Sequence, residues 1–185
     1  MRVAVYGGSF NPPHLAHEMV AKWVLDSASA DAVWLVPVYR HAFETTHSKV
    51  LAPFEQRLRW CEAMAAGFGG GVQVSSVEST LPTPSFTIDT LRHLASHYPQ
   101  HEFRLVIGAD ILDQVDGWKD WDAIVVDYPP IVVGREGYSS PDGVPVFPAV
   151  SSTEIRDRLA RGGDASDLVS PSVWAVLQGE HPWGP

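Results

Sequence analysis

The stretch that decides the fold is Val3–His17, which reads VAVYGGSFNPPHLAH. It opens with a short apolar run, Val3–Tyr6, that two glycines end, and this pattern is typical of a buried strand. Glycines let a backbone approach a ligand closely, and a helix that starts near Pro13 aims free N–H groups at an anion. The stretch therefore predicts a strand, a phosphate-binding turn and a helix in immediate succession.

Strands and helices continue to alternate beyond this turn. Apolar residues recur at three- and four-residue spacing over Ala16–Val24, and a second apolar run follows at Ala32–Pro37, so the chain opens with one βαβ unit. The same criteria predict further strands at Val72–Val74, Phe103–Ile107, Ile131–Val133 and Val144–Phe147, and helices at Pro53–Ala66, Phe86–His97, Thr153–Arg161 and Ser172–Leu177. This alternation predicts a Rossmann-like, doubly wound α/β fold, in which helices cover both faces of one mostly parallel sheet. Ligands are then expected at the carboxyl ends of its strands.

Length and composition limit the classes of protein to which this chain can belong. Its 185 residues, 45% of them hydrophobic, suffice for one substantial core, so we expect one domain over residues 1–185, with the helical segment at about 151–180 as part of it. The formal net charge of −9 opposes nucleic acid binding. No apolar run reaches the roughly 18 residues of a membrane helix, and no signal-sequence core precedes Gly7. We therefore expect a cytoplasmic protein that binds neither nucleic acid nor membranes, while a homo-oligomer stays open.

A second candidate phosphate-binding element lies near the other end of the chain. Ser151 and Glu154 follow a strand-like run and have the spacing of a capping box, which fixes a helix start. Backbone donors and hydroxyl groups then point out of this helix terminus, and Arg156, one turn later, can reach the same anion. The alternative is an ordinary capped helix at the surface.

His14 and His17 lie three residues apart in the first turn of the first predicted helix. They share a face there, so both imidazoles can donate hydrogen bonds to phosphate oxygens. Simple packing and half of a metal site are the alternatives. The chain has no His-Glu-x-x-His pattern, and its lone Cys61, expected as a buried thiol, gives no paired thiolates, so a zinc site lacks its usual further ligands. The glycines match neither the dinucleotide fingerprint nor a P-loop.

Together, these segments resemble the signatures of the nucleotidylyltransferase superfamily, which has a Gly-x-Phe-x-Pro-x-His-x-Gly-His segment after the first strand and a Ser-Ser-Thr-x-x-Arg segment near the end. Three intervening segments look like its nicotinate-nucleotide adenylyltransferase branch: PSFTIDTL at Pro84–Leu91, IGAD at Ile107–Asp110 and VVGR at Val132–Arg135. The resemblance runs from about Val3 to Leu159. It implies transfer of AMP from ATP to nicotinate mononucleotide in NAD biosynthesis, with Mg²⁺ carried by ATP and with deamido-NAD and pyrophosphate as products.

The resemblance also implies three sets of site residues. The ATP-binding set lines the nucleotide site, holds the phosphates or contacts the adenosine, and consists of Gly7, Gly8, Ser9, Phe10, His14, His17, Gly108, Asp110, Ser152, Thr153 and Arg156. The mononucleotide-binding set faces the pyridine ring or its phosphate and consists of Thr87, Trp118, Arg135 and His41. The catalytic set neutralises charge on phosphate oxygens as pyrophosphate leaves and consists of His14, His17, Arg156 and Lys49.

Two departures from the family pattern affect this interpretation. Ala16 stands where the family usually has glycine, a change that a helix tolerates. The segment after Pro37 lacks the family's proline-rich loop with adjacent His and Lys, so Lys49 is the nearest counterpart of that lysine, and His41 or Arg40 shares its work. Nicotinamide mononucleotide and other small phosphate esters, such as phosphopantetheine, therefore stay open as acceptors.

The residue types also bear on the chemistry. Stacking on Trp118 suits a flat heterocycle, whereas Trp121 is expected in the core. Because the phosphate of a mononucleotide is already anionic near neutral pH, catalysis should depend on electrostatics and positioning, and Cys61 has no part in it. A protein that binds ATP as a sensor, without turnover, is the non-enzymatic alternative.

Overall fold

The apolar runs of the sequence form one sheet in the computed structural model, which describes residues 1–27, 29–40, 51–139 and 142–184. Its strands are β1 (Arg2–Gly8), β2 (Ala32–Pro37), β3 (Val72–Val74), β4 (Glu102–Gly108), β5 (Ile131–Arg135) and β6 (Val146–Phe147). Neighbouring strands are parallel, in the order β3-β2-β1-β4-β5-β6. From β1 the chain adds β2 and then β3 on one side. It then crosses to the other side of β1, where it adds β4, β5 and β6. This confirms the expected doubly wound fold.

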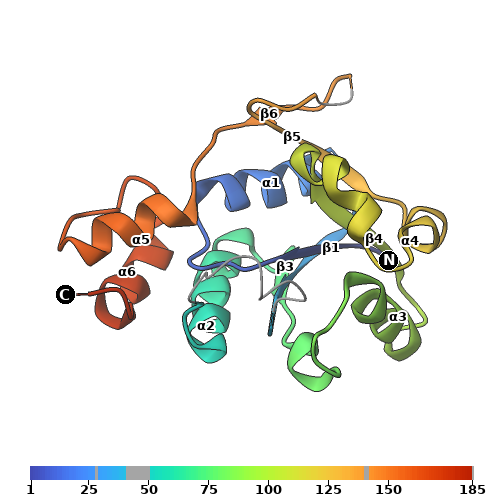
Figure 1. The fold of residues 1–185 in the computed structure, drawn as a ribbon, viewed down its shortest axis with the longest axis horizontal. Helices are drawn as coiled ribbons and strands as arrows, with labels where there is room; N and C mark the ends of the chain where they lie inside the picture. Colours follow the sequence, from blue (N-terminus) through green and yellow to red (C-terminus); the bar gives the residue numbers. More distant parts are fainter. Residues whose placement is uncertain (28, 41–50, 140–141, 185) are drawn as a thin grey trace.

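Helices connect the strands and complete the chain. They are α1 (Leu15–Asp26), α2 (Phe54–Ala65), α3 (Thr87–His97), α4 (Trp121–Asp127), α5 (Ser152–Ala160) and α6 (Pro171–Glu180), with 3₁₀ helices η1 (Ala66–Phe68), η2 (Val77–Thr80) and η3 (Ala109–Gly117). Figure 1 shows helices on both sides of the sheet, with α5 and α6 together at one end of the molecule. Within the described ranges, no helix combines the length and the apolar character needed to cross a membrane.

The central strands are buried on both faces. Ala4 of β1 belongs to an apolar cluster that includes side chains of α1, α2, α5 and α6, while Val3 and Val5 belong to a cluster with α3 and α4. Successive side chains of a strand point to opposite faces, so the two clusters occupy the two faces of the sheet. This explains why these strands appear in the sequence as unbroken apolar runs. Cys61 of α2 is a buried free thiol, as expected.

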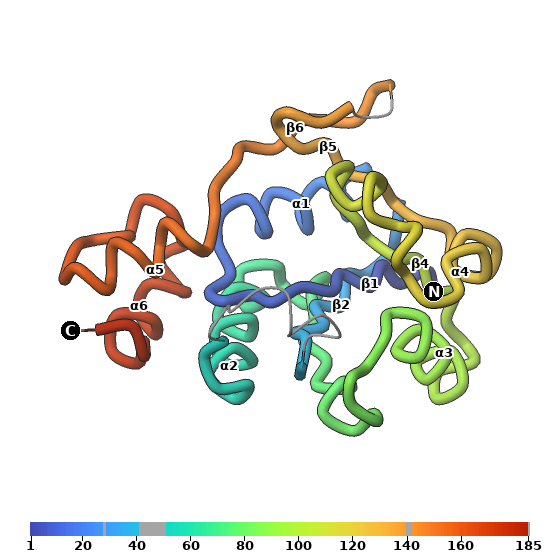
Figure 2. The backbone as a smooth tube through the Cα atoms, viewed as in Figure 1, coloured from blue at the N-terminus to red at the C-terminus, as the bar shows by residue number. Residues whose placement is uncertain are grey.

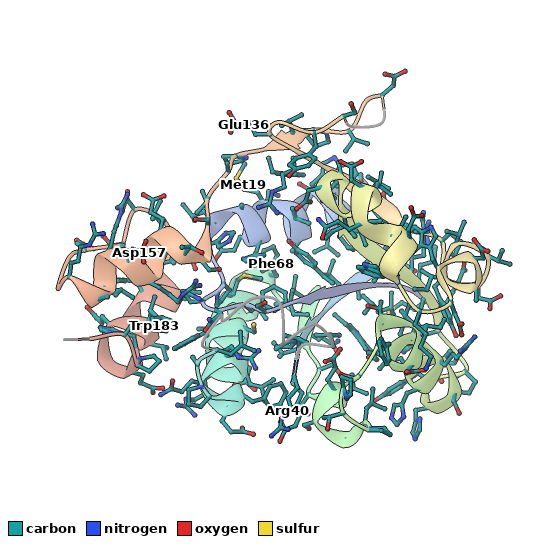
Figure 3. All side chains as sticks on the ribbon, in the orientation of Figure 1. Met19, Arg40, Phe68, Glu136, Asp157 and Trp183 are labelled. Carbon is teal, nitrogen blue, oxygen red and sulfur yellow. The ribbon has the colours of Figure 1, made fainter. Side chains whose placement is uncertain are left out.

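The C-terminal helices extend the first of these clusters. Figure 2 traces the backbone from β6 to α5 and α6, which lie near α2 and far from the N-terminus. Ile155 and Leu177 are fully buried in the cluster that contains Ala4. The side chain of Trp183, labelled in Figure 3, packs on Trp60 of α2 with ring centroids 5.4 Å apart. The segment at about 151–180 therefore shares its core with the sheet.

The region between β4 and β5 differs most from expectation. The periodicity predicts no element at residues 109–127, yet η3 and α4 occupy it. Helix α4 has only seven residues, and its apolar residues Ala123–Val126 are consecutive, so its sequence lacks the three- and four-residue spacing that marks a helix. Val125 and Val126 are accordingly 43% and 75% exposed. Trp121 is half-buried at the edge of the α3–α4 cluster. Helix α1 begins at Leu15 because His14 is its N-cap.

Candidate active site

A cavity of about 690 Å³ opens at the carboxyl ends of the strands. Its walls come from the ends of β1, β4 and β5, from η3 and from the N-termini of α1, α3 and α5. Strands β1 and β4 are neighbours at the point where the strand order reverses. Open α/β sheets bind their ligands at such a point. The predicted site residues that the structure describes all line this cavity: Gly7, Gly8, Ser9, Phe10, His14, His17, Thr87, Gly108, Asp110, Trp118, Arg135, Ser152, Thr153 and Arg156. His41 and Lys49 lie outside the described residues.

The turn after β1 exposes its backbone to the cavity. Phe10 has a left-handed φ of 43°, which is rare for a bulky residue, and its side chain is buried. A Cβ atom at Gly8 would approach the Phe10 ring to 3.3 Å, so glycine lets the turn close over that ring. Since Gly7 and Gly8, at the end of β1, have no side chains, a phosphate can approach the backbone where the turn begins.

Hydrogen bonds join this turn to the second predicted phosphate-binding element. Ser152 Oγ donates to the carbonyl oxygen of Pro12 at 2.9 Å, across 140 residues of sequence. Arg156 Nη1 donates to the carbonyl oxygen of Asn11 at 2.9 Å, and its Nη2 donates to Thr153 Oγ1 at 3.1 Å. The turn after β1 and the start of α5 therefore form one continuous wall of the cavity.

His14 and His17 pack together as neutral rings. Their ring centroids are 3.7 Å apart, and the backbone N–H of His14 donates to His17 Nδ1 at 3.1 Å, which helps to cap α1. Burial, assisted by Arg135, lowers the pKa of His14 to about 4. Burial, assisted by His14 and Arg135, holds the pKa of His17 well below its ordinary value. Both rings are neutral near pH 7, and because His17 Nδ1 accepts a hydrogen bond, its proton lies on Nε2.

An ion pair lies at the end of β4 and β5. Arg135 Nη1 is 3.0 Å from Asp110 Oδ2, which joins a residue of the mononucleotide-binding set to one of the ATP-binding set. A Cβ atom at Gly108 would collide with the carboxylate of Asp110, so the glycine makes room for this carboxylate. Arg135 is also close enough to His14 and His17 to lower their pKa values. Arg135, a member of the mononucleotide-binding set, therefore lies beside three residues of the ATP-binding set.

The remaining wall combines the start of α3 with the segment after η3. Thr87 is the first residue of α3, where backbone N–H groups have no partner within the helix. Trp118 packs edge-on against Trp121, with ring centroids 5.8 Å apart. Lys119 Nζ bonds both carboxylate oxygens of Asp89, at 2.9 and 2.8 Å. This ion pair holds the Trp118 segment against the first turn of α3.

Some lining residues carry no signal in the sequence. Tyr6 and Glu78 line the cavity, but neither belongs to a pattern with a chemical meaning. Ser85 also lines it and lies in the Pro84–Leu91 segment, but the pattern of that segment indicated no role for it. Lys119 also lines it, and its position next to Trp118 could have indicated it. In the part of the chain that the structure describes, no group of three or more His, Cys, Asp or Glu side chains could hold a metal ion.

Comparisons with known proteins agree with this geometry. Residues 5–158 match the model of the Cytidylyltransferase-like family. A protein from Anaeromyxobacter sp. (strain K), named "Probable nicotinate-nucleotide adenylyltransferase", is 47% identical over 179 residues, which cover 95% of this chain and 93% of that protein. A protein of the same name from Myxococcus xanthus (strain DK1622) is 40% identical over 182 residues, which cover 98% of this chain and 93% of that protein.

A solved structure supports the likeness of fold. Plasmodium falciparum nicotinic acid mononucleotide adenylyltransferase complexed with NaAD superposes with a TM-score of 0.79, at 19% identity, over 98% of this chain and 97% of that chain. The family match and the two relatives extend over most of the chain and include both predicted phosphate-binding elements. The chain therefore belongs to the cytidylyltransferase-like family, in its nicotinate-nucleotide adenylyltransferase branch.

Proposed function

We propose that this protein transfers the AMP group of ATP to nicotinate mononucleotide and so forms deamido-NAD and pyrophosphate in NAD biosynthesis. The observation that carries the proposal is the joining of two phosphate-binding elements, 140 residues apart in sequence, in a cavity whose lining also contains Thr87 and Trp118. A triphosphate and a flat heterocycle thus each have a suitable part of the same cavity. The name of the relatives at 47% and 40% identity supports this assignment.

The phosphates of ATP would lie against the turn after β1 and the start of α5. The backbone at Gly7 and Gly8 allows close approach, Arg156 supplies a permanent positive charge, and Nε2–H of His17 supplies a neutral donor. An anion nearby favours protonated imidazole, so His14 and His17 can gain charge as ATP binds. Mg²⁺ would enter with ATP and would help to neutralise the charge of its phosphates.

The pyridine ring would stack on Trp118. Its carboxylate would lie near Thr87 at the N-terminus of α3, where free N–H groups favour an anion. Lys119 lies beside this terminus, but Asp89 balances its charge. A negatively charged nicotinate ring gains from the free N–H groups of the helix terminus, whereas the neutral carboxamide of nicotinamide gains less. His41 and Arg135 are proposed to contact the ring or the phosphate of the same substrate.

The reaction requires positioning and charge neutralisation more than proton transfer. An oxygen of the mononucleotide phosphate attacks the α-phosphorus of ATP, and the bond from that phosphorus to the bridging oxygen breaks as pyrophosphate leaves. The nucleophile is already anionic, so no general base is needed. Arg156, His14 and His17 would stabilise the charge that grows on the phosphate oxygens. Lys49 is proposed to share this task.

Pyrophosphate release tests the proposal. ATP and Mg²⁺ are supplied with nicotinate mononucleotide, nicotinamide mononucleotide or phosphopantetheine, and mass spectrometry identifies the product. We expect the fastest release with nicotinate mononucleotide. Faster release with nicotinamide mononucleotide would keep the reaction but change the acceptor, and release with phosphopantetheine alone would contradict the role of Trp118. No release with any acceptor would favour an ATP sensor.

A further inference from the structure

Two charged side chains are buried in the described part of the chain without a direct role in the proposed chemistry. Arg57 on α2 is 1% exposed, and Glu78 in η2 is 8% exposed. Burying a charge is costly unless hydrogen bonds compensate for the lost water. The partners of these two residues therefore indicate what each charge does in the fold.

Glu78 joins two segments that line the cavity. Its Oε2 accepts hydrogen bonds from the backbone N–H of Tyr39 at 3.0 Å and from Ser85 Oγ at 2.9 Å. Its Oε1 accepts a hydrogen bond from Thr90 Oγ1 at 3.2 Å. One carboxylate thus fixes the backbone after β2 relative to the start of α3, which carries Thr87.

Arg57 performs the corresponding task behind the turn after β1. Its Nη1 donates to the carbonyl oxygen of Ser9 at 2.9 Å, and its Nε donates to the carbonyl oxygen of Ala52 at 3.0 Å. The backbone N–H of Ala52 in turn donates to Asn11 Oδ1 at 2.9 Å. These bonds form a closed set of contacts that fixes Ser9 and Asn11, at the two ends of the buried Phe10, against α2.

We propose that these two buried charges are positioning residues, one for each half of the site: Glu78 fixes the wall that binds the mononucleotide, and Arg57 fixes the turn that binds the phosphates of ATP. Neither needs to touch a substrate. The inference rests on the proposed function, because it assigns one substrate to each half of the cavity. It predicts that the two residues affect different Michaelis constants.

The test compares KM for nicotinate mononucleotide with KM for ATP in variants of the two residues, and each variant should raise a different one of these two constants. Because small misplacements of binding groups have large effects, we expect Glu78→Ala to raise KM for nicotinate mononucleotide roughly tenfold and KM for ATP less than about twofold. Arg57→Met should raise KM for ATP and leave the other KM nearly unchanged. Both KM values would move together, or only the active fraction would fall, if these residues merely stabilised the fold.

Glu78→Gln separates geometry from charge. The amide oxygen of glutamine can accept the hydrogen bonds from Tyr39 and Ser85, while its NH₂ group donates to the hydroxyl of Thr90. A positioning role therefore predicts that Glu78→Gln restores the KM for nicotinate mononucleotide. A KM that stays as high in Glu78→Gln as in Glu78→Ala would show that the charge itself matters and would overturn the positioning role.

Arg104→Met is the matched control for Arg57→Met. Arg104 also directs its guanidinium at backbone carbonyl oxygens, those of Ser29, Pro129 and Pro130, but it lies near the amino ends of the strands. Both KM values should stay unchanged in this variant. An effect equal to that of Arg57→Met would overturn the proposal for Arg57.

Two further arrangements keep the test decisive. Where Glu78→Ala fails to fold, Thr90→Val replaces it, and where Arg57→Met fails to fold, Arg57→Lys replaces it. Each replacement should raise the same KM as the original variant, by a smaller factor. If the unmodified protein does not release pyrophosphate, the proposed function fails. Calorimetric titration of ATP and of nicotinate mononucleotide then gives the corresponding split in Kd, and equal changes in both Kd values would overturn the inference as well.

Discussion

His17 combines two tasks that two substitutions can separate. Its Nδ1 accepts the N–H of His14 and helps to cap α1, which leaves Nε2–H to donate to a phosphate. We expect His17→Ala to remain folded but to lose about 10²–10³ in kcat. Asparagine replaces the acceptor Nδ1 but not the donor Nε2, so His17→Asn should recover thermal stability without recovering turnover. Steady-state pyrophosphate release would contradict this role if either variant turned over at a near-normal rate.

His14 should make the stability of the protein depend on pH. Its pKa is about 4 in the folded protein and 6.5 ordinarily, so between these values the unfolded chain binds a proton that the folded protein does not. Stability is therefore greatest above pH 6.5 and falls toward pH 4, by about 3 kcal/mol from this residue. Urea denaturation from pH 4 to pH 7.5 should show a shallower decline in His14→Gln. Parallel curves for the two proteins would contradict the low pKa.

Residues in contiguous motifs could be predicted from the sequence, because the residue types of a motif and their spacing indicate its chemistry. This holds for the segments Gly7–His17 and Ser151–Arg156, whose predicted site residues line one cavity. Arg57 and Glu78 could not be predicted in this way. Arg57 reaches Ser9 across 48 residues, and Glu78 reaches Tyr39 across 39. Such partners become neighbours only after the chain has folded.

At the scale of elements, the spacing of apolar residues identified the helices that bury one face. It failed for a helix that buries little, such as α4. Helix α3 packs Ile88, Leu91 and Leu94 into the core and has the expected period. Helix α4 buries only Ile124 among its seven residues. A helix this short is not stable by itself and depends on tertiary contacts, so its local sequence gives little indication of it.

The start of α5 offers a measurable test of a predicted cap. Ser151 Oγ accepts the backbone N–H of Glu154 at 3.2 Å, so one half of the expected capping box is present. Loss of such a cap typically costs about 1 kcal/mol. We expect Ser151→Ala to lower the free energy of unfolding by that amount and Ser151→Asn, which can cap equally well, to restore it. Chemical denaturation of the three proteins would contradict the cap if Ser151→Ala were as stable as the unmodified protein.

At the scale of the whole molecule, alternation of strands and helices was enough to predict the parallel sheet and the edge at which the cavity opens. The family resemblance assigns α5 and the first turn to one ATP site, but composition and spacing alone do not show that the chain returns from β6 to place them in contact. That contact depends on Ser152 and Arg156 meeting carbonyl oxygens of Pro12 and Asn11. Carbonyl groups are present in every residue, so a pairing of this kind leaves no mark in composition or spacing.

The shared core predicts that the C-terminal helices and the sheet unfold together. Leu177 of α6 is fully buried in the cluster that contains Ala4 of β1 and Trp60 of α2. Truncating such a leucine to alanine costs roughly 2–5 kcal/mol, and we expect Leu177→Ala to shift the unfolding of the whole molecule by this amount. Val126→Ala is the matched control, because Val126 is 75% exposed and should change stability by less than about 0.5 kcal/mol.

Denaturation curves recorded with two probes show whether the C-terminal helices and the sheet unfold together. Far-ultraviolet circular dichroism follows all helices, whereas tryptophan fluorescence is sensitive to packing at Trp60 and Trp183, whose rings meet between α2 and the C-terminal segment. A single cooperative unit gives the same midpoint by both probes, in the unmodified protein and in Leu177→Ala. Two separated transitions, with only one of them shifted by the substitution, would mean that α5 and α6 form a separate unit. The wall that Ser152 and Arg156 contribute to the cavity could then detach while the sheet stays folded.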